Sequence, residues 1–366
     1  MSGDELLYLT ALNLTLRYRG GAARALVEHF GTASEIFRQT AAALSKTTGM
    51  TMDITTKLLS KQNLQAAEAE INWTHQQGIR TYTVCDPSYP KRLFHCPDAP
   101  VILYQSGPAN LSPPKALAVV GTRSATPYGL HTTGQIIKNL AARGHDCAII
   151  SGLAYGIDIA AHRAALDAGL PTIAVFAFGL DHIQPAQHLA TAKKIMEQGA
   201  CVSDFPTKTM ITKANFLKRN RIIAGLADGV LVIESKEKGG ALITAEIAQS
   251  YDREVMAVPG RWGDLCSQGC NSLIREQKAA LVNKVEDIEQ QLGWTPSKTE
   301  VPAAFMQERD LIDAGLLQAL EQGPCSMDQL YRMSRIPLPE LSARLMRLAI
   351  KGSIKRIHQN QYCLSC

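Results

Sequence analysis

The sequence predicts an α/β protein built on an extended Rossmann-like parallel sheet, preceded by a helical module and followed by a winged helix. Three observations lead to this fold class. Between residues 79 and 293, short apolar runs end in glycine and alternate with helical stretches. Residues 1–78 are rich in leucine and alanine at helical spacing, and residues 305–366 have the pattern of three helices and a hairpin.

The first 78 residues are expected to form a module similar to SAM or helix-hairpin-helix domains. Leu6, Leu9 and Leu12 recur at helical spacing, and Gly20 and Gly21 lie at the predicted turn between two helices. Backbone N–H groups of such a hairpin can bind phosphate. An ordinary packing module explains the glycines equally well, so both interpretations stay open.

Five continuous apolar runs are predicted to be strands of a sheet that helices cover on both faces. They are Ala116–Val120, Cys147–Ile150, Thr172–Phe176, Gly229–Ile233 and Glu254–Val258. Right-handed crossovers between parallel strands place the loops that follow the strands on one edge of the sheet. The residues of these loops are therefore expected to lie near one another.

Residues 294–304 are a polar stretch with two prolines and are predicted to be a linker. In the winged helix that follows, Ser326 is the expected cap of the second helix. The third helix carries Arg344 and Arg347 as the arginines available to contact bases. Two such residues are few for a transcriptional regulator, so that function is not favoured.

Composition and charge exclude several classes of protein. The 366 residues carry a formal charge of +5, which permits a polyanionic partner without requiring one. Asp4 and Glu5 stand where a secretory signal would have Lys or Arg, and no apolar run approaches the roughly 20 residues that cross a bilayer. A cytoplasmic protein without a membrane partner is expected.

The nine cysteines are scattered, as is typical of reduced thiols in a cytosolic protein. Neither Cys266 with Cys270 nor Cys363 with Cys366 has the further ligands that structural zinc requires. The glycine fingerprints of dinucleotide-binding and P-loop proteins are also missing. No metal or other cofactor is therefore expected.

The loop after the predicted strand Ala116–Val120 has the residues of a phosphate-binding site. Gly121 allows close approach of the backbone, Thr122 adds a hydroxyl, and Arg123 adds a fixed cation near the start of a helix. A tight turn with a surface arginine is the alternative.

The loop after the predicted strand Cys147–Ile150 begins with Ser151 and Gly152, which are candidate phosphate contacts. It runs into a helix where Asp158 and His162 lie four residues apart on one face, as an acid/base pair could. No nucleophile or metal set accompanies them. Capping and packing roles are favoured, and no catalytic residue is predicted.

The densest signal is a cluster of four cations around one phenylalanine. Cations neutralise phosphates, and an aromatic face stacks on unpaired bases, which a duplex hides. This pattern favours single-stranded nucleic acid over an ordinary solvated helix face. The candidate contacts are Lys213, Phe216, Lys218, Arg219, Asn220 and Arg221.

A further glycine-rich loop precedes a helix that contains Thr244. Gly240 and Thr244 are expected to contact phosphate through backbone and hydroxyl groups. Glu246 could be a lone catalytic acid, but first-turn carboxylates more often stabilise helices.

Together these stretches resemble the DNA-processing protein A (DprA/Smf) family. The matching segments are Val120–Arg123, Ser151–Asp158, Phe216–Gly225, Gly240–Thr244 and Ala257–Gly260. The resemblance implies a homodimer that binds incoming single-stranded DNA during natural transformation, protects it and loads the RecA recombinase. It also implies DNA contacts by Arg123, Lys213, Phe216 and the following cations, with Gly121, Ser151 and Gly152 in support.

One enzyme class remains as an alternative, the nucleoside-monophosphate phosphoribohydrolases with the lysine-decarboxylase-like fold. Their signature is Pro-Gly-Gly-x-Gly-Thr-x-x-Glu. The segment Lys238–Glu246 lacks the proline and the third glycine and has one residue too many before Thr244. The sequence therefore favours a binding protein over a hydrolase.

Overall fold

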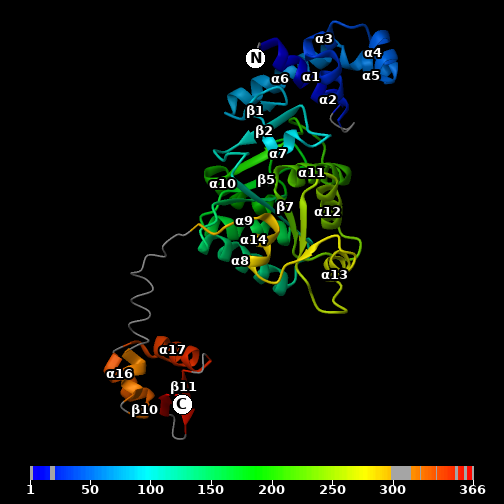
Figure 1. Cartoon of the computed structure of the whole chain (residues 1–366). Coiled ribbons are helices and arrows are strands. Elements are labelled where there is room, and N and C mark those ends of the chain that lie inside the picture. Colours follow the sequence, from blue (N-terminus) through cyan, green and yellow to red (C-terminus); the bar gives the residue numbers. More distant parts are fainter. Residues whose placement is uncertain are drawn as a thin grey trace. The chain divides into compact units, whose positions relative to one another are not determined.

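The computed structural model describes residues 3–16, 21–297, 315–321, 323–334, 336–350, 353–357 and 361–364. The chain divides into two compact units, Met1–Ser297 and Lys298–Cys366 (Figure 1). The predicted fold class is confirmed, since a helical N-terminal region, a large parallel sheet and a winged helix are all present. The predicted boundaries at residues 78/79, 293/294 and 304/305 stay predictions.

The sheet of the first unit has nine strands in the order β1-β2-β6-β5-β4-β3-β7-β8-β9. The strands from β6 to β9 in this order are parallel, whereas β1 and β2 add an antiparallel edge. Their bounds are β1 Arg80–Thr83, β2 Ile102–Ser106, β3 Lys115–Val120, β4 Cys147–Ser151, β5 Thr172–Val175, β6 Ala200–Ser203, β7 Gly229–Val232, β8 Glu254–Ala257 and β9 Ala280–Leu281.

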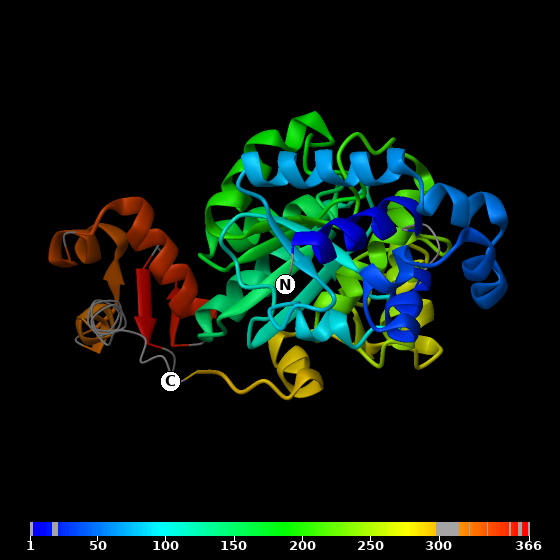
Figure 2. The same cartoon turned by 90° about the horizontal axis from the view of Figure 1, so that it is seen from above.

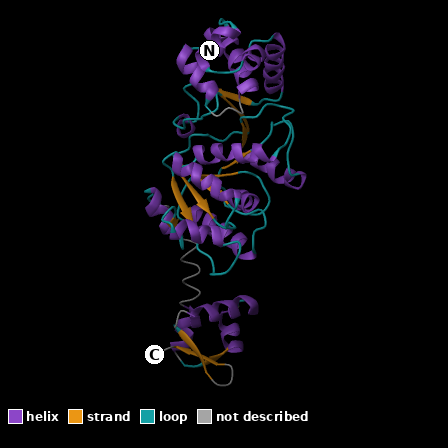
Figure 3. Cartoon of the chain, turned by 90° about the vertical axis from the view of Figure 1, so that its right-hand side faces the viewer, coloured by secondary structure: helices purple, strands orange, loops and turns teal. Residues whose placement is uncertain are grey.

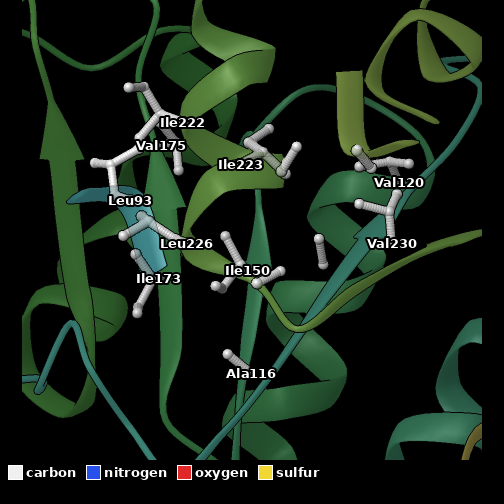
Figure 4. Close-up of a cluster of buried hydrophobic side chains, with 14 of the residues drawn as sticks. Leu93, Ala116, Val120, Ile150, Ile173, Val175, Ile222, Ile223, Leu226 and Val230 are labelled. Carbon is white, nitrogen blue, oxygen red and sulfur yellow. The ribbon is translucent and has the colours of Figure 1, made fainter. Parts of the chain in front are cut away.

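Helices cover both faces of the parallel strands because side chains alternate along each strand. In β3, Ala116, Ala118 and Val120 face one buried cluster, and Leu117 and Val119 face another. The first cluster (Figure 4) is closed by α7 Lys91–Phe94, α11 Lys213–Leu226, α12 Gly240–Ser250 and α13 Gln268–Arg275. The opposite face is covered by α8 Pro127–Ala142, α9 Ile157–Asp167, α10 Leu189–Gln198 and α14 Val285–Leu292.

The N-terminal helices share a core with the β1–β2 end of the sheet. Val84, Val101, Ile102 and Tyr104 belong to the same buried cluster as leucines of these helices. Gly21 has a left-handed backbone (φ 68°) and packs against the backbone of Pro97, while Gly20 lies outside the described residues. Figure 2 looks down on the helices, which are α1 Gly3–Leu16, α2 Ala22–Phe30, α3 Ala33–Phe37, α4 Ala41–Thr48, α5 Met52–Leu58 and α6 Lys61–Gln76.

The second unit is a winged helix with its own core (Figure 3). Residues 315–321 are helical and are followed by β10 Cys325–Ser326, α16 Met327–Ser334, α17 Leu338–Ile350, β11 Ile354–Ile357 and β12 Gln361–Leu364. Ser326 caps α16 as predicted, because its hydroxyl accepts from the Gln329 N–H at 3.3 Å. Arg344 is buried and bonds Glu340 at 2.8 Å, so it does not offer the free arginine expected from the sequence. The side chain of Arg347 lies outside the described residues.

A chain that ends at residue 297 is expected to fold without the second unit, because each unit has a separate buried cluster. Its thermal unfolding midpoint should lie within about 4 °C of the corresponding transition in the full chain, which is roughly 1 kcal/mol for a domain of this size. Circular dichroism measured during heating checks this. Loss of the cooperative transition in the shortened chain would contradict it.

Candidate nucleic-acid interface

The candidate site lies where the strand order reverses. The chain builds β3, β4, β5 and β6 outward in one direction and then returns to place β7 on the other side of β3. The loop after β3 therefore leads to a helix on one face, and the loop after β7 leads to a helix on the opposite face. Such a switch point opens a crevice at the carboxyl ends of the strands. Here the crevice holds a cavity of about 290 Å³.

The loop after β3 forms one wall of this cavity. The N–H of Thr122 donates to the Glu234 carbonyl at 2.8 Å, which ties the loop to the end of β7. A β-carbon at Gly121 would collide with Ile157, so this glycine permits close packing of α9. Gly121, Thr122 and Arg123 all line the cavity, as their predicted grouping requires.

Arg123 and Phe216 meet at the cavity. The exposed Arg123 guanidinium lies over the half-buried Phe216 ring, with its Cζ 4.9 Å from the ring centroid. This contact is a cation–π pair between the β3 loop and α11. The structure thus joins two sequence signals that are separated by more than ninety residues. Lys213 is exposed at the first position of the same helix, and Lys218 is half-buried on it.

The remaining cations of the cluster have different surroundings. Arg219 is 3% exposed and lines the cavity, and its Nη1 donates to the Val175 carbonyl at 2.9 Å. Burial lowers the pKa of Arg219 to about 10, although nearby Asp158 opposes this effect. Arg221 instead bonds the Asp204 carboxylate and the Asp98 carbonyl, and it is not among the described residues that line the cavity.

Ser151 and Gly152 are not among the described residues that line the cavity. The Ser151 hydroxyl is fully buried and donates to the Val119 carbonyl at 2.6 Å. Any side chain at Gly152 would overlap the Arg219 guanidinium. In the ligand-free protein, the absence of a side chain at Gly152 therefore makes room for Arg219.

The loop after β7 forms the opposite wall. Gly240 begins α12, and the capping residue Gly239 supplies no side-chain hydrogen bond. The first N–H groups and the helix dipole therefore create positive potential beside the cavity. Thr244 is buried and lines the cavity, and the Asn220 amide donates to the Gly240 carbonyl at 3.5 Å.

Lys236 and Lys238 are cavity residues that the sequence analysis missed. Both are exposed and line the cavity from the β7 loop. The two lysines, one on either side of Glu237, precede Gly239 and Gly240 in the loop after a predicted strand, and this was a signal that could have identified them. Together with Arg123 and Arg219 they make this cavity strongly cationic.

Comparison with known proteins agrees with this geometry. Residues 80–293 match the family model described as DNA recombination-mediator protein A, and residues 301–360 match the DprA winged helix domain. The chain belongs to the DprA family. The resemblance predicted from the motifs is thereby confirmed.

Several DprA relatives and structures are similar to the chain. It is 34% identical to Smf of Escherichia coli over 86% of this chain and 85% of that protein. It is 37% identical to a putative DprA of Mycobacterium tuberculosis over 64% of this chain but only 63% of that relative. The structure of Streptococcus pneumoniae DprA has a TM-score of 0.62, with 33% identity over 69% of this chain and 87% of that one. A structure of Helicobacter pylori DprA, which describes how that protein binds single-stranded DNA, has a TM-score of 0.53. Its sequence is 30% identical over 58% of this chain and 95% of that one.

Asp158 and His162, the possible acid/base pair of this DprA-family chain, have different surroundings. Asp158 lines the cavity, and burial raises its pKa while Arg219 opposes the rise. His162 is fully buried, is not among the described lining residues, and has its Nδ1 2.7 Å from the Thr172 hydroxyl. Glu246 is exposed and is also absent from the described cavity lining.

The described residues contain no group of three or more His, Cys, Asp or Glu that could hold a metal ion. Within the same residues, no helix is both long and apolar enough to span a membrane.

His162 should make stability depend on pH. Burial lowers its pKa to about 3, whereas the unfolded value is about 6.5. Between these values the unfolded chain binds a proton that the folded chain does not, so the stability contribution of this residue falls as the pH drops. His162→Gln should lose less stability than the wild type between pH 7 and pH 5.

Urea unfolding of both proteins at the two pH values measures this difference. Asp158 has a raised pKa and so acts in the opposite direction, but it is present in both proteins and cancels in the comparison. Equal losses in the two proteins would show that His162 does not contribute.

Proposed function

We propose that this chain is a non-catalytic single-stranded DNA-binding protein that acts as a recombination mediator in DNA uptake. The observation that carries the proposal is the Arg123–Phe216 pair at the mouth of a cationic cavity. A phosphate in the cavity would meet Arg123, Lys236 and Lys238 together with the start of α12. A base next to that phosphate would find the Phe216 ring.

Single strands fit this arrangement better than duplex does. Stacking on Phe216 requires an unpaired base whose face is accessible. The related Helicobacter pylori protein, which has a single-stranded DNA binding mode, supports the same ligand class. Arg221 is left out of the proposed contacts because it is paired with Asp204.

The hydrolase alternative has less support. A catalytic acid must reach the reacting atoms, and Glu246 is outside the described cavity lining. Asp158 lies in the lining, but the glycine spacing of the hydrolase signature is missing. We therefore propose that the cavity holds a strand without cleaving it.

The parts of the proposal that concern partners, location and biological role come from the resemblance to the family. We propose a cytoplasmic homodimer that protects incoming single-stranded DNA during natural transformation and loads RecA on it. The sheet offers DNA one edge, which leaves other surfaces of the first unit for a second copy or for RecA. Arg344 of the winged helix is left out of the proposed DNA contacts, because it is buried against Glu340.

Variants in the site should weaken binding to an oligothymidylate. Phe216→Ala should cost about 1–3 kcal/mol if the ring stacks on a base. Arg123→Ala and Lys213→Ala should weaken binding and reduce the salt slope by about 1, because each removes one cation near the phosphates. Fluorescence anisotropy over a range of salt concentrations, with matched duplex as the competitor, measures these effects.

Lys193→Ala is the matched control, because this exposed lysine lies on α10, which covers the face of the sheet opposite to α11. Its affinity should equal that of the wild type. Equal affinity for duplex and single strands, or unchanged binding in all three site variants, would refute the assignment.

The mediator role predicts an effect on recombination. RecA strand exchange should start sooner on DNA that is already covered by single-strand-binding protein when this chain is added. Arg123→Ala should remove the acceleration, since the mediator must hold the strand. RecA and single-strand-binding protein from the same organism should be used. If the wild type only inhibits strand exchange with these proteins, the mediator role fails while DNA binding stands.

A further inference from the structure

Trp262 is the most exposed large apolar side chain in the described part of the chain, with a relative exposure of 102%. It lies in the loop after β8, between Gly260 and Gly263, and Gly263 has a left-handed backbone (φ 92°). Within the described residues its indole has no hydrogen-bond partner and no ring contact. An indole held fully in water contributes nothing to the core and leaves both faces of its ring accessible to a partner.

The loop that carries Trp262 is fixed beside the cavity. The Tyr128 hydroxyl donates to the Pro259 carbonyl at 3.1 Å, and Cys266 Sγ lies 3.9 Å from the Ser124 carbonyl. Both of these partners follow Arg123 in the segment between β3 and α8 or in its first turn. Trp262 is three residues from Pro259, so its Cα lies within about 11 Å of that anchor.

The other end of the loop reaches the second wall of the cavity. The Gly269 N–H donates to the Ser235 carbonyl at 2.8 Å, directly before Lys236. β8 pairs with β7 in parallel, so the loops after these two strands leave the same edge of the sheet. The Trp262 loop therefore contacts both loops that form the cavity.

The charges near Trp262 favour a polyanion. Arg261 is exposed next to it, and Lys236 and Lys238 are exposed on the neighbouring β7 loop. The exposed carboxylates of these two loops are Asp264 near Trp262 and Glu237 between the two lysines, so the three cations outnumber them. An exposed aromatic ring among a majority of cations is the combination that binds unpaired nucleotides.

We propose that Trp262 is a second base-stacking site, which extends the DNA path from Phe216 across the loop after β8. This inference rests on the proposed single-stranded DNA function. The cavity and Phe216 hold one part of the strand, and Trp262 stacks on a base that has already left the cavity. The number of nucleotides bound by one chain is then larger than the cavity alone can hold.

Oligonucleotide length separates the two stacking sites. Trp262→Ala should weaken binding of an oligothymidylate of about 16 nucleotides by about fivefold or more, and should leave one of about four nucleotides nearly unchanged. Trp262→Phe should retain much of the affinity because it keeps an aromatic face. Leu265→Ala is the matched control, since this exposed residue of the same loop has no aromatic ring, and it should bind like the wild type.

Tryptophan fluorescence gives a second measurement. Trp262 is the exposed one of three tryptophans, as Trp294 is buried and Trp73 is half-buried. The long oligothymidylate should quench its emission and shield it from acrylamide, and Trp262→Phe should abolish both changes.

The outcomes distinguish this inference from the proposed function. If Trp262→Ala binds both lengths like the wild type while Phe216→Ala loses affinity, the second site is refuted and the proposed function stands. If Trp262→Ala changes only self-association in sedimentation experiments, the loop is a protein contact and the inference is overturned. If the wild type binds neither oligonucleotide, the proposed function and this inference both fail.

Discussion

The buried guanidinium of Arg219 is the interaction on which the site depends. A buried charge is stable only when neighbouring groups satisfy it. Arg219 on α11 donates from Nη1 to the Val175 carbonyl at the end of β5, faces Asp158 in the first turn of α9, and occupies the space that Gly152 leaves after β4. Its buried Nε has no hydrogen-bond partner among the described residues. One side chain therefore sets the relative positions of two strand ends and a helix.

The reversal of strand order explains why this arrangement lies beside a cavity. Because the loops after β3 and β7 diverge to opposite faces, a crevice opens between them at the carboxyl ends of the strands. The buried Glu234 holds this gap in shape, since its carboxylate accepts from the Thr126 N–H at 2.9 Å and its carbonyl accepts from Thr122. Glu234 belongs to the loop after β7, whereas its partners Thr122 and Thr126 belong to the segment after β3.

The sequence predicts the scaffold better than the direction of individual side chains. All five predicted strands agree with the structure to within one residue, because continuous apolar runs ending in glycine are distinctive. Strand β6 was missed, since Ala200–Ser203 is followed by Asp204 and Phe205 and not by a glycine loop. The partner of Arg221 could not be predicted, because Asp98 and Asp204 are brought to it by tertiary folding. Arg219 was foreseeable in part, since it precedes the buried Ile222 and Ile223 by three and four residues and so shares their helix face.

The cation–π contact between Arg123 and Phe216 also has a consequence for the entropy of binding. A long arginine side chain on an exposed loop normally samples many rotamers and loses that freedom when it captures a ligand. Resting on the ring restricts Arg123 before any strand arrives, and the bonds of Thr122 and Glu234 restrict the backbone beneath it. The loop is therefore preorganised, so more of the electrostatic attraction remains as affinity. A flexible loop with the same charges would bind the same polyanion more weakly.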